Sequence, residues 1–287
     1  MKPRLVIGLF LLLLLSIGAG LSARATGISL PHPVPSFSQN YTLGPDAWGN
    51  ATLGSDGCPD SFRVSGCLVT AFASVLAYYG IEVSVPAAQS FTGRPATGMD
   101  PGILNDWLRA HGGFGRCGGD AYGSCCLEWS RLPAGIELSF YTNRSDVGLN
   151  PVAEVVIDHA LRQGYPIVAG VHWGASCNGS GKQTEDCHWI VLTGKAGDTY
   201  TILDPYNPDP TSPRGVKTTL DDGTRGSYII DRFVVVTGTI PAEGGATPKI
   251  DHVPASEEGT SSPSLLDSIA VLVLLLAALT AIVFATR

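Results

Sequence analysis

Residues 66–80 read GCLVTAFASVLAYYG, and this stretch decides the fold of the chain. The run from Leu68 to Tyr79 is apolar with helical spacing, and Gly80 ends it. Cys67 therefore stands at the first turn of a predicted helix, where free N–H groups and the helix dipole favour a thiolate over a thiol. Taken alone, the segment fits a catalytic nucleophile or a structural cysteine equally well.

Two stretches far downstream supply partners for this sulfur. His188 begins an apolar, β-branched run over residues 188–193, and the next such run, residues 199–203, leads directly to Asp204. The residues between the runs predict a tight reversal, so the strands would pair antiparallel and bring Asp204 beside His188. Cysteine hydrolases use this order of nucleophile, base on a strand and orienting acid on the neighbouring strand.

Alternatives exist for both partners. His172-Trp173 repeats the dipeptide found at His188, which makes His172 a competing base. We favour His188 because a strand and a partner strand ending in an acid follow it. Asp204 precedes a proline, and Asp-Pro is also ordinary at a strand end followed by a turn.

The remaining patterns predict an α+β fold with N-terminal helices packed on an antiparallel sheet. Helix signals beyond the first include a cap and N1 proline at Asp100-Pro101 and a third start at Asn150-Pro151. Val152, Val155, Val156, Ala160 and Leu161 would share one face of the third helix, which stops at Gly164. Strands are expected over the runs 165–171, 188–193, 199–203 and 228–236.

The chain divides into four predicted segments. Residues 1–25 have the charged start, apolar centre and small-residue cleavage site of a secretory signal peptide. Residues 26–240 form one compact domain, and residues 241–264, rich in Pro, Gly and Ser, form a stalk. Residues 265–287 form a single-pass transmembrane anchor, which places the domain on the extracytoplasmic side of the cell membrane.

Two alternatives remain for the C-terminal segment. The uncharged run Ile269–Ala285 is long enough, at about 1.5 Å per residue, to cross a bilayer core. It would otherwise be a buried C-terminal helix, or a sorting tail that is removed and replaced by a lipid or wall linkage.

Charge and ligand patterns narrow the class of protein. The net charge is −7 and the lysines and arginines are scattered, which excludes a nucleic-acid binder. Cys177, Cys187, His188 and His172 lack the paired spacing of structural zinc sites, and residues 204–209 lack the glycine turn and closing glutamate of a calcium loop. We therefore expect no metal and no cofactor.

Several short motifs resemble a known family. The chain is similar to the secreted branch of the double-glycine (bacteriocin-processing) leader peptidase-like proteins, which are papain-like cysteine peptidases, over about residues 34–240. The resemblance rests on QN at 39–40, DAWGN at 46–50, SGCLVT at 65–70, LAYYG at 76–80, LNDWL at 104–108, GGF at 112–114, HWIV at 188–191 and ILDP at 202–205.

The resemblance implies a papain-like fold and a set of roles. Cys67 would be the nucleophile, His188 the general base and acid, Asp204 the residue that orients the imidazole, and Gln39 a donor to the oxyanion. In the papain pattern the glutamine stands close before the cysteine, whereas here Cys58 intervenes. The family's transporter fusion and its cleavage after Gly-Gly do not carry over.

Seven cysteines in an extracytoplasmic domain leave an odd one after pairing, and the family argument makes Cys67 that one. The other pairings stay open. Local hypotheses are Cys177 with Cys187, and Cys117 with either Cys125 or Cys126. A further hypothesis is a disulfide between Cys67 and Cys58, which would switch off the activity by blocking the nucleophile.

The function expected from these observations is a membrane-anchored, extracytoplasmic cysteine hydrolase that cleaves peptide or protein substrates. Two alternatives come from other classes: a non-catalytic module of the same fold that binds peptides or surface polymers, and an amidase or acyltransferase acting on cell-wall amides. The presence of all three triad residue types favours catalysis.

Overall fold

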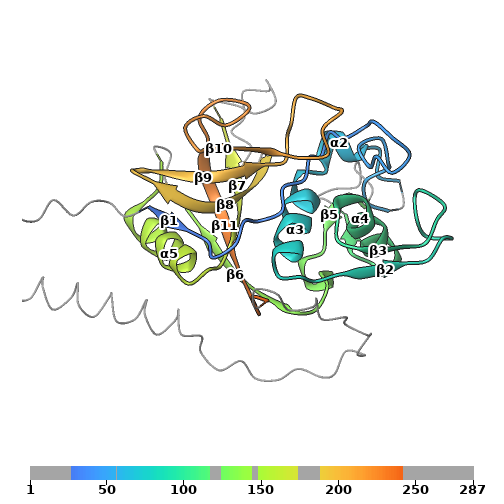
Figure 1. Ribbon diagram of the computed structural model, residues 1–287, viewed down its shortest axis with the longest axis horizontal. Helices are drawn as coiled ribbons and strands as arrows, with labels where there is room; N and C mark the ends of the chain where they lie inside the picture. Colours follow the sequence, from blue (N-terminus) through green and yellow to red (C-terminus); the bar gives the residue numbers. More distant parts are fainter. Residues whose placement is uncertain (1–26, 56, 117–123, 144–147, 174–187, 242–287) are drawn as a thin grey trace, which may run out of the picture. The chain divides into compact units, whose positions relative to one another are not determined.

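The computed structural model in Figure 1 describes residues 27–55, 57–116, 124–143, 148–173 and 188–241. The predicted signal peptide, stalk and anchor lie outside these ranges, apart from Pro241. None of the described helices is long and apolar enough to cross a bilayer. In chain order the elements are β1 (Ile28–Ser29), α2 (Phe62–Ser65), α3 (Cys67–Tyr78), β2 (Val83–Val85), β3 (Ala96–Gly98), α4 (Pro101–Ala110), β4 (Phe114–Gly115), β5 (Cys126–Leu127), the 3-10 helix η1 (Trp129–Arg131), β6 (Ile136–Thr142), α5 (Pro151–Arg162), β7 (Ile167–His172), β8 (His188–Ala196), β9 (Thr199–Asp204), β10 (Val216–Thr219) and β11 (Ile229–Gly238).

The described part is α+β, as the sequence predicts. Its main sheet has the order β10-β9-β8-β7-β11-β6, with β1 added beside β8, and its pairs are antiparallel. The central hairpin of β8 and β9 turns at Gly197-Asp198, because Ala196 faces Thr199 across the pair. Gly197 has φ +62°, a conformation that two-residue hairpin turns require and glycine adopts without strain.

Helix α3 lies between the sheet and α4 (Figure 1), in contact with β7, β8 and α4. Because neighbours cover it on several sides, almost its whole length is buried and apolar. An aromatic cluster fixes it to the sheet, since the Trp129 ring lies 5.3 Å from Phe72 of α3 and 5.6 Å from Trp189 of β8. The position of the sheet relative to the helix start therefore depends on rigid, close-packed rings.

The predicted caps of the other helices are confirmed. The Asp100 side chain accepts from the Ile103 N–H at α4, and the Asn150 side chain accepts from the Ala153 N–H at α5. The predicted face of α5 is wrong in part. Val152 and Val155 are 70% and 56% exposed, whereas the buried face of the helix consists of Ala153, Ile157, Ala160 and Leu161.

The structure also contains strands that the sequence patterns do not reveal. β6 lies before α5 in the chain and forms the edge of the sheet beside β11, so helices and strands are not separated along the chain as expected. Its burial pattern is intermediate at most positions, because an edge strand lacks the continuous apolar run of a central one. β10 at the opposite edge is missed for the same reason.

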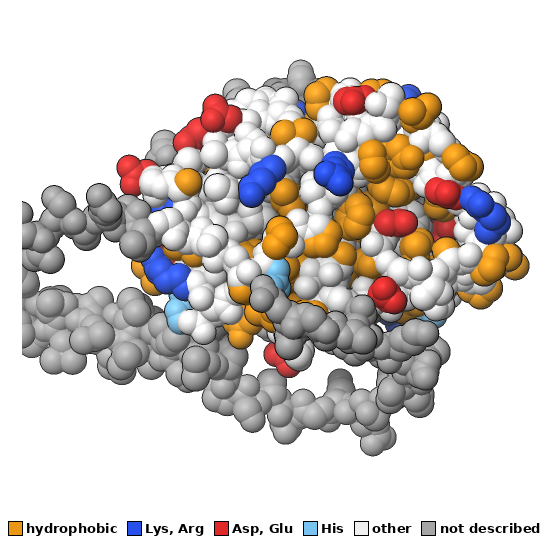
Figure 2. Space-filling view, viewed as in Figure 1, with side chains coloured by type: hydrophobic (Ala, Val, Ile, Leu, Met, Phe, Trp, Pro, Cys, Tyr) orange, Lys and Arg blue, Asp and Glu red, His pale blue; other side chains and the backbone are white. Residues whose placement is uncertain are grey.

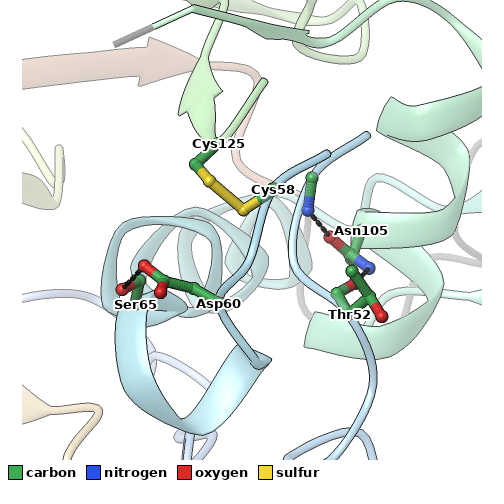
Figure 3. The surroundings of a disulfide bond; sticks show 7 residues. Thr52, Cys58, Asp60, Ser65, Asn105 and Cys125 are labelled. Atoms are coloured by element: carbon green, nitrogen blue, oxygen red, sulfur yellow. Dashed lines mark hydrogen bonds between the residues drawn. A yellow bond between two sulfur atoms is a disulfide. The ribbon is translucent and has the colours of Figure 1, made fainter. Parts of the chain in front are cut away.

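A disulfide joins Cys58 to Cys125 and ties the loop before α2 to the segment before β5 (Figure 3). Polar contacts hold the same loop, as Figure 3 also shows: Ser65 donates to Asp60, and the Asn105 amide of α4 donates to the Thr52 carbonyl. These ties fix the chain segment that leads into α3. On the face shown in Figure 2, basic side chains lie dispersed among acidic and apolar ones.

Candidate active site

Cys67 is the first residue of α3 and is partly exposed. The helical hydrogen bonds are interrupted at Gly66, so α2 ends at Ser65 and a new helix begins at the cysteine. The first N–H groups of a helix have no acceptor within it, and they surround the sulfur with positive partial charge. Gly66 is needed at this break because a side chain there would overlap the carbonyl oxygen and ring of Phe62.

His188 is the first residue of β8 and Asp204 the last of β9, and both side chains are buried. His188 Nε2 lies 2.7 Å from Asp204 Oδ1. Because Asp204 occupies Nε2, the other ring nitrogen, Nδ1, is left to face a nucleophile. Cys67 is among the groups that raise the pKa of the imidazole, so its sulfur lies close to the ring, and the structure brings the three predicted residues together.

Asp204 accepts hydrogen bonds from three further residues. The Tyr206 backbone N–H donates to Oδ1 at 2.9 Å. Thr224 Oγ1 and the Tyr228 hydroxyl donate to Oδ2 at 2.6 and 2.7 Å. A carboxylate with this many donors stays ionised although it is buried, and its orientation toward His188 is fixed.

The pKa values of the pair move in opposite directions. Burial lowers the pKa of His188, but the bonds and negative charges of Asp204 and Cys67 outweigh it and raise the pKa to about 9. Burial raises the pKa of Asp204, yet the bond and positive charge of His188, with the donors Thr224 and Tyr228, hold it below the ordinary value. The site therefore favours an imidazolium beside a carboxylate at neutral pH.

Gln39 connects the chain just after β9 with α2, the short helix that precedes Cys67. Its backbone N–H donates to the Pro205 carbonyl, the residue after Asp204, and its Nε2 donates to the Arg63 carbonyl in α2. One amide hydrogen of Nε2 is thus used by Arg63, and the second is left for another acceptor. The side chain is buried, and among the residues that the structure describes Oε1 has no hydrogen-bond partner.

The competing base, His172, is part of a second pair. Its Nδ1 lies 2.7 Å from Asp231 Oδ1. His172 is the last residue of β7, and Asp231 lies in β11 at the irregularity between Ile230 and Arg232. Val171 faces His188 across β7 and β8, so His172 lies one position beyond that partner. His188, whose pKa reflects the interaction with Cys67, is the histidine at the sulfur.

The cysteines bear out one expectation and correct another. Among the described cysteines, Cys67 is free. Cys58 pairs with Cys125, so of the two bridges considered for Cys117 the one to Cys125 is wrong. Cys58 and Cys67 are not bridged to each other in the structure. Cys126 is disulfide-bonded as well. The hypothesis of a Cys177–Cys187 bridge falls outside the described residues.

Within the described ranges, no group of three or more His, Cys, Asp or Glu side chains is arranged to hold a metal ion. The two histidines of the zinc interpretation are each bonded to a different aspartate. The two cysteines of that zinc interpretation, Cys177 and Cys187, lie outside the residues that the structure describes.

Sequence reasoning missed Thr224, Tyr228 and Tyr206 as partners of the acid. Tyr228 begins the predicted fourth strand, so its place beside Asp204 depends on how that strand enters the sheet. Thr224 comes from the loop between β10 and β11, where nothing in the local pattern marks a buried role. A polar side chain in a Gly-rich loop has no such signal, because loop conformation is set by tertiary contacts.

The model of the Peptidase_C39 like family matches residues 31–228, a span that includes Gln39, Cys67, His188 and Asp204. A comparison with curated proteins finds no significant match.

Proposed function

The chain belongs to the Peptidase_C39 like family, and on that basis we propose that it is a papain-like cysteine peptidase with Cys67 as its nucleophile. The observation that carries the proposal is the buried hydrogen bond between His188 and Asp204 beside a free cysteine at a helix start. Peptide or protein substrates follow from the family.

In the proposed mechanism His188 Nδ1 takes the thiol proton, and the thiolate attacks the carbonyl carbon of the scissile bond. The charge that develops on the carbonyl oxygen would be held by N–H groups of the first turn of α3 and by the second hydrogen of Gln39 Nε2. His188 then gives its proton to the leaving amine. Water, deprotonated by His188, hydrolyses the thioester and frees Cys67.

We further propose that the peptidase acts outside the cytoplasm, held in the cell membrane by residues 265–287. The support is the arrangement of apolar runs at the two ends of the sequence and the disulfides of the domain, which persist in oxidising compartments. Alkaline carbonate washing should leave the full chain in the membrane and release a variant that lacks residues 265–287. Release of both would contradict the anchor.

The activity itself is tested with the full-length protein and a complex peptide mixture. Wild type and Cys67→Ala are incubated with the mixture under mild reduction, and new peptide termini are identified by mass spectrometry. We expect new termini with the wild type that are absent with Cys67→Ala. Identical products from both would contradict the proposal and favour a binding module of the same fold.

A further inference from the structure

The guanidinium of Arg225 packs against two aromatic rings close to the His188–Asp204 pair. The guanidinium carbon Cζ of Arg225 lies 4.0 Å from the ring centroid of Tyr206 and 5.2 Å from that of Trp173. Both distances are within the range of cation–π attraction, which for arginine includes stacking of the planar guanidinium. Arg225 is exposed, so the rings orient the group without covering it.

The loop that presents Arg225 is fixed by the site itself. The neighbouring Thr224 donates to Asp204 through both its hydroxyl and its backbone N–H. The Tyr228 hydroxyl, from the end of the same loop, donates to Asp204 and lies 3.2 Å from the Thr224 hydroxyl. The cation is thus built onto the same carboxylate that orients the imidazole.

Arg225 has no anionic partner in the part of the chain that the structure describes. Four described cations do have carboxylate partners there: Arg94 with Asp46, Arg109 with Asp106, Arg162 with Asp158, and Lys195 with Glu154 and Asp158. What distinguishes Arg225 is its position over two aromatic rings. An oriented guanidinium keeps its edge N–H groups for an acceptor, and a carboxylate matches their spacing. A ring-stacked arginine without a carboxylate is therefore suited to an anion that arrives with a ligand.

The chemistry of the site says which part of a substrate lies there. The imidazole delivers its proton to the leaving nitrogen, so the peptide that follows the scissile bond must begin beside His188. The Trp173 ring lies 6.4 Å from the His188 ring, and the Tyr228 ring lies 5.9 Å from it. The Trp173 ring contacts both the His188 ring and the Arg225 guanidinium, so Arg225 lies one aromatic ring away from His188.

We propose that Arg225 is a specificity-determining residue that binds a carboxylate on the leaving-group peptide, within the first residues after the scissile bond. This inference rests on the proposed function. The carboxylate comes either from an Asp or Glu side chain or from the C-terminus of a short leaving peptide. Both sources offer the same two oxygens to the guanidinium, and the test below separates them.

The test measures kcat/KM of the full-length protein on matched peptides that share a cleavage site found in the complex mixture. Three versions differ after the cut: an acidic residue with an amidated C-terminus, neutral residues with a free C-terminus close to the cut, and neutral residues with an amidated C-terminus. The variants are Arg225→Gln, Arg225→Glu and, as a control, Arg131→Gln. Arg131 is an exposed arginine of η1 that takes part in none of these ring contacts.

We expect at least one carboxylate peptide to be favoured about tenfold over the neutral one, as charge-assisted hydrogen bonds allow. Arg225→Gln should abolish that ratio, Arg225→Glu should invert it, and Arg131→Gln should leave it unchanged. A purely structural role of Arg225 in holding Thr224 would lower all three rates alike and leave the ratio intact. An intact ratio in Arg225→Gln overturns the proposal.

Failure of catalysis is separated from failure of this inference by a binding measurement. Fluorescence anisotropy with Cys67→Ala uses labelled acidic and neutral amidated peptides, with and without Arg225→Gln. Tighter binding of the acidic peptide that disappears with Arg225→Gln supports the carboxylate site even if the wild type cleaves nothing. Equal binding of both peptides to Cys67→Ala overturns it.

Discussion

His188 and Asp204 stand two residues out of register on adjacent antiparallel strands, and their side chains meet at 2.7 Å. Continuing the register from Val191 opposite Leu203 would put Tyr206 across from His188, so the acid reaches the imidazole along a diagonal. That diagonal leaves Tyr206 free to donate its N–H to the same carboxylate. The strand pair thus orients the side chains of both His188 and Asp204.

Asp204→Asn should lower kcat/KM by about two to four orders of magnitude. An amide places N–H groups against a site whose other partners, Thr224 and Tyr228, are donors, so the imidazole loses its anion and its orientation. The measurement is peptide cleavage by the full-length protein. Asp231→Asn changes the second His–Asp pair and serves as the control. Equal loss in both variants would contradict the role of Asp204.

The pH dependence of cleavage should extend far to the alkaline side. The ion pair needs protonated His188, whose pKa is raised to about 9, so kcat/KM should fall only as pH rises through that value. With Asp204→Asn the fall should move toward the ordinary imidazole value, about 6.5. An alkaline limb at the same pH in both proteins would show that another group controls it.

The same pKa shifts give the sign of the stability change with pH. The raised pKa of His188 contributes stability that is complete below about pH 6.5 and is lost as pH rises through about 9. The lowered pKa of Asp204 contributes stability present above about pH 3.8 and lost as pH falls through the folded value. Denaturant unfolding from pH 5 to pH 10 should therefore show less alkaline destabilisation for His188→Ala. Parallel curves would contradict this linkage.

The elements that carry the site were predictable from sequence because each has a strong local signal. The apolar run after Cys67 fits one helix, and the runs that begin at His188 and end at Asp204 leave a turn of fitting length between them. The acid's other donors were not predictable. Thr224 sits in a loop whose conformation comes from tertiary contacts, and β6, at the sheet edge, has no continuous apolar pattern.

Gly66→Ala should reduce both stability and activity. The added Cβ would overlap the carbonyl and ring of buried Phe62, and overpacking of this kind costs about 1–3 kcal/mol. Relief by a shift of the helix start would displace Cys67 from His188. Denaturant unfolding and kcat/KM measure the two effects. Val64→Ala, a truncation at an exposed site of α2, is the control, and comparable losses in both variants would argue against the role of Gly66.

Loss of the Cys58–Cys125 bridge should lower the free energy of unfolding by about 4 kcal/mol. The two cysteines are separated by 67 positions, and closing a loop of that length removes much of the entropy of the unfolded chain. The double variant Cys58→Ala, Cys125→Ala avoids leaving a new thiol, and denaturant unfolding measures the change. A loss well below 1 kcal/mol would mean that the polar ties of Asn105 and Ser65 hold the loop alone.

The most direct test of the proposed active site is the alkylation rate of Cys67 at neutral pH. The full-length wild type, His188→Ala and His172→Ala are treated with iodoacetamide, and labelling of Cys67 is followed by peptide mass spectrometry. An activated pair predicts fast labelling in the wild type and in His172→Ala, and labelling slowed at least about tenfold in His188→Ala. Equal rates in all three proteins, or a Cys67 that is bridged and never labelled, would contradict the proposed catalytic role.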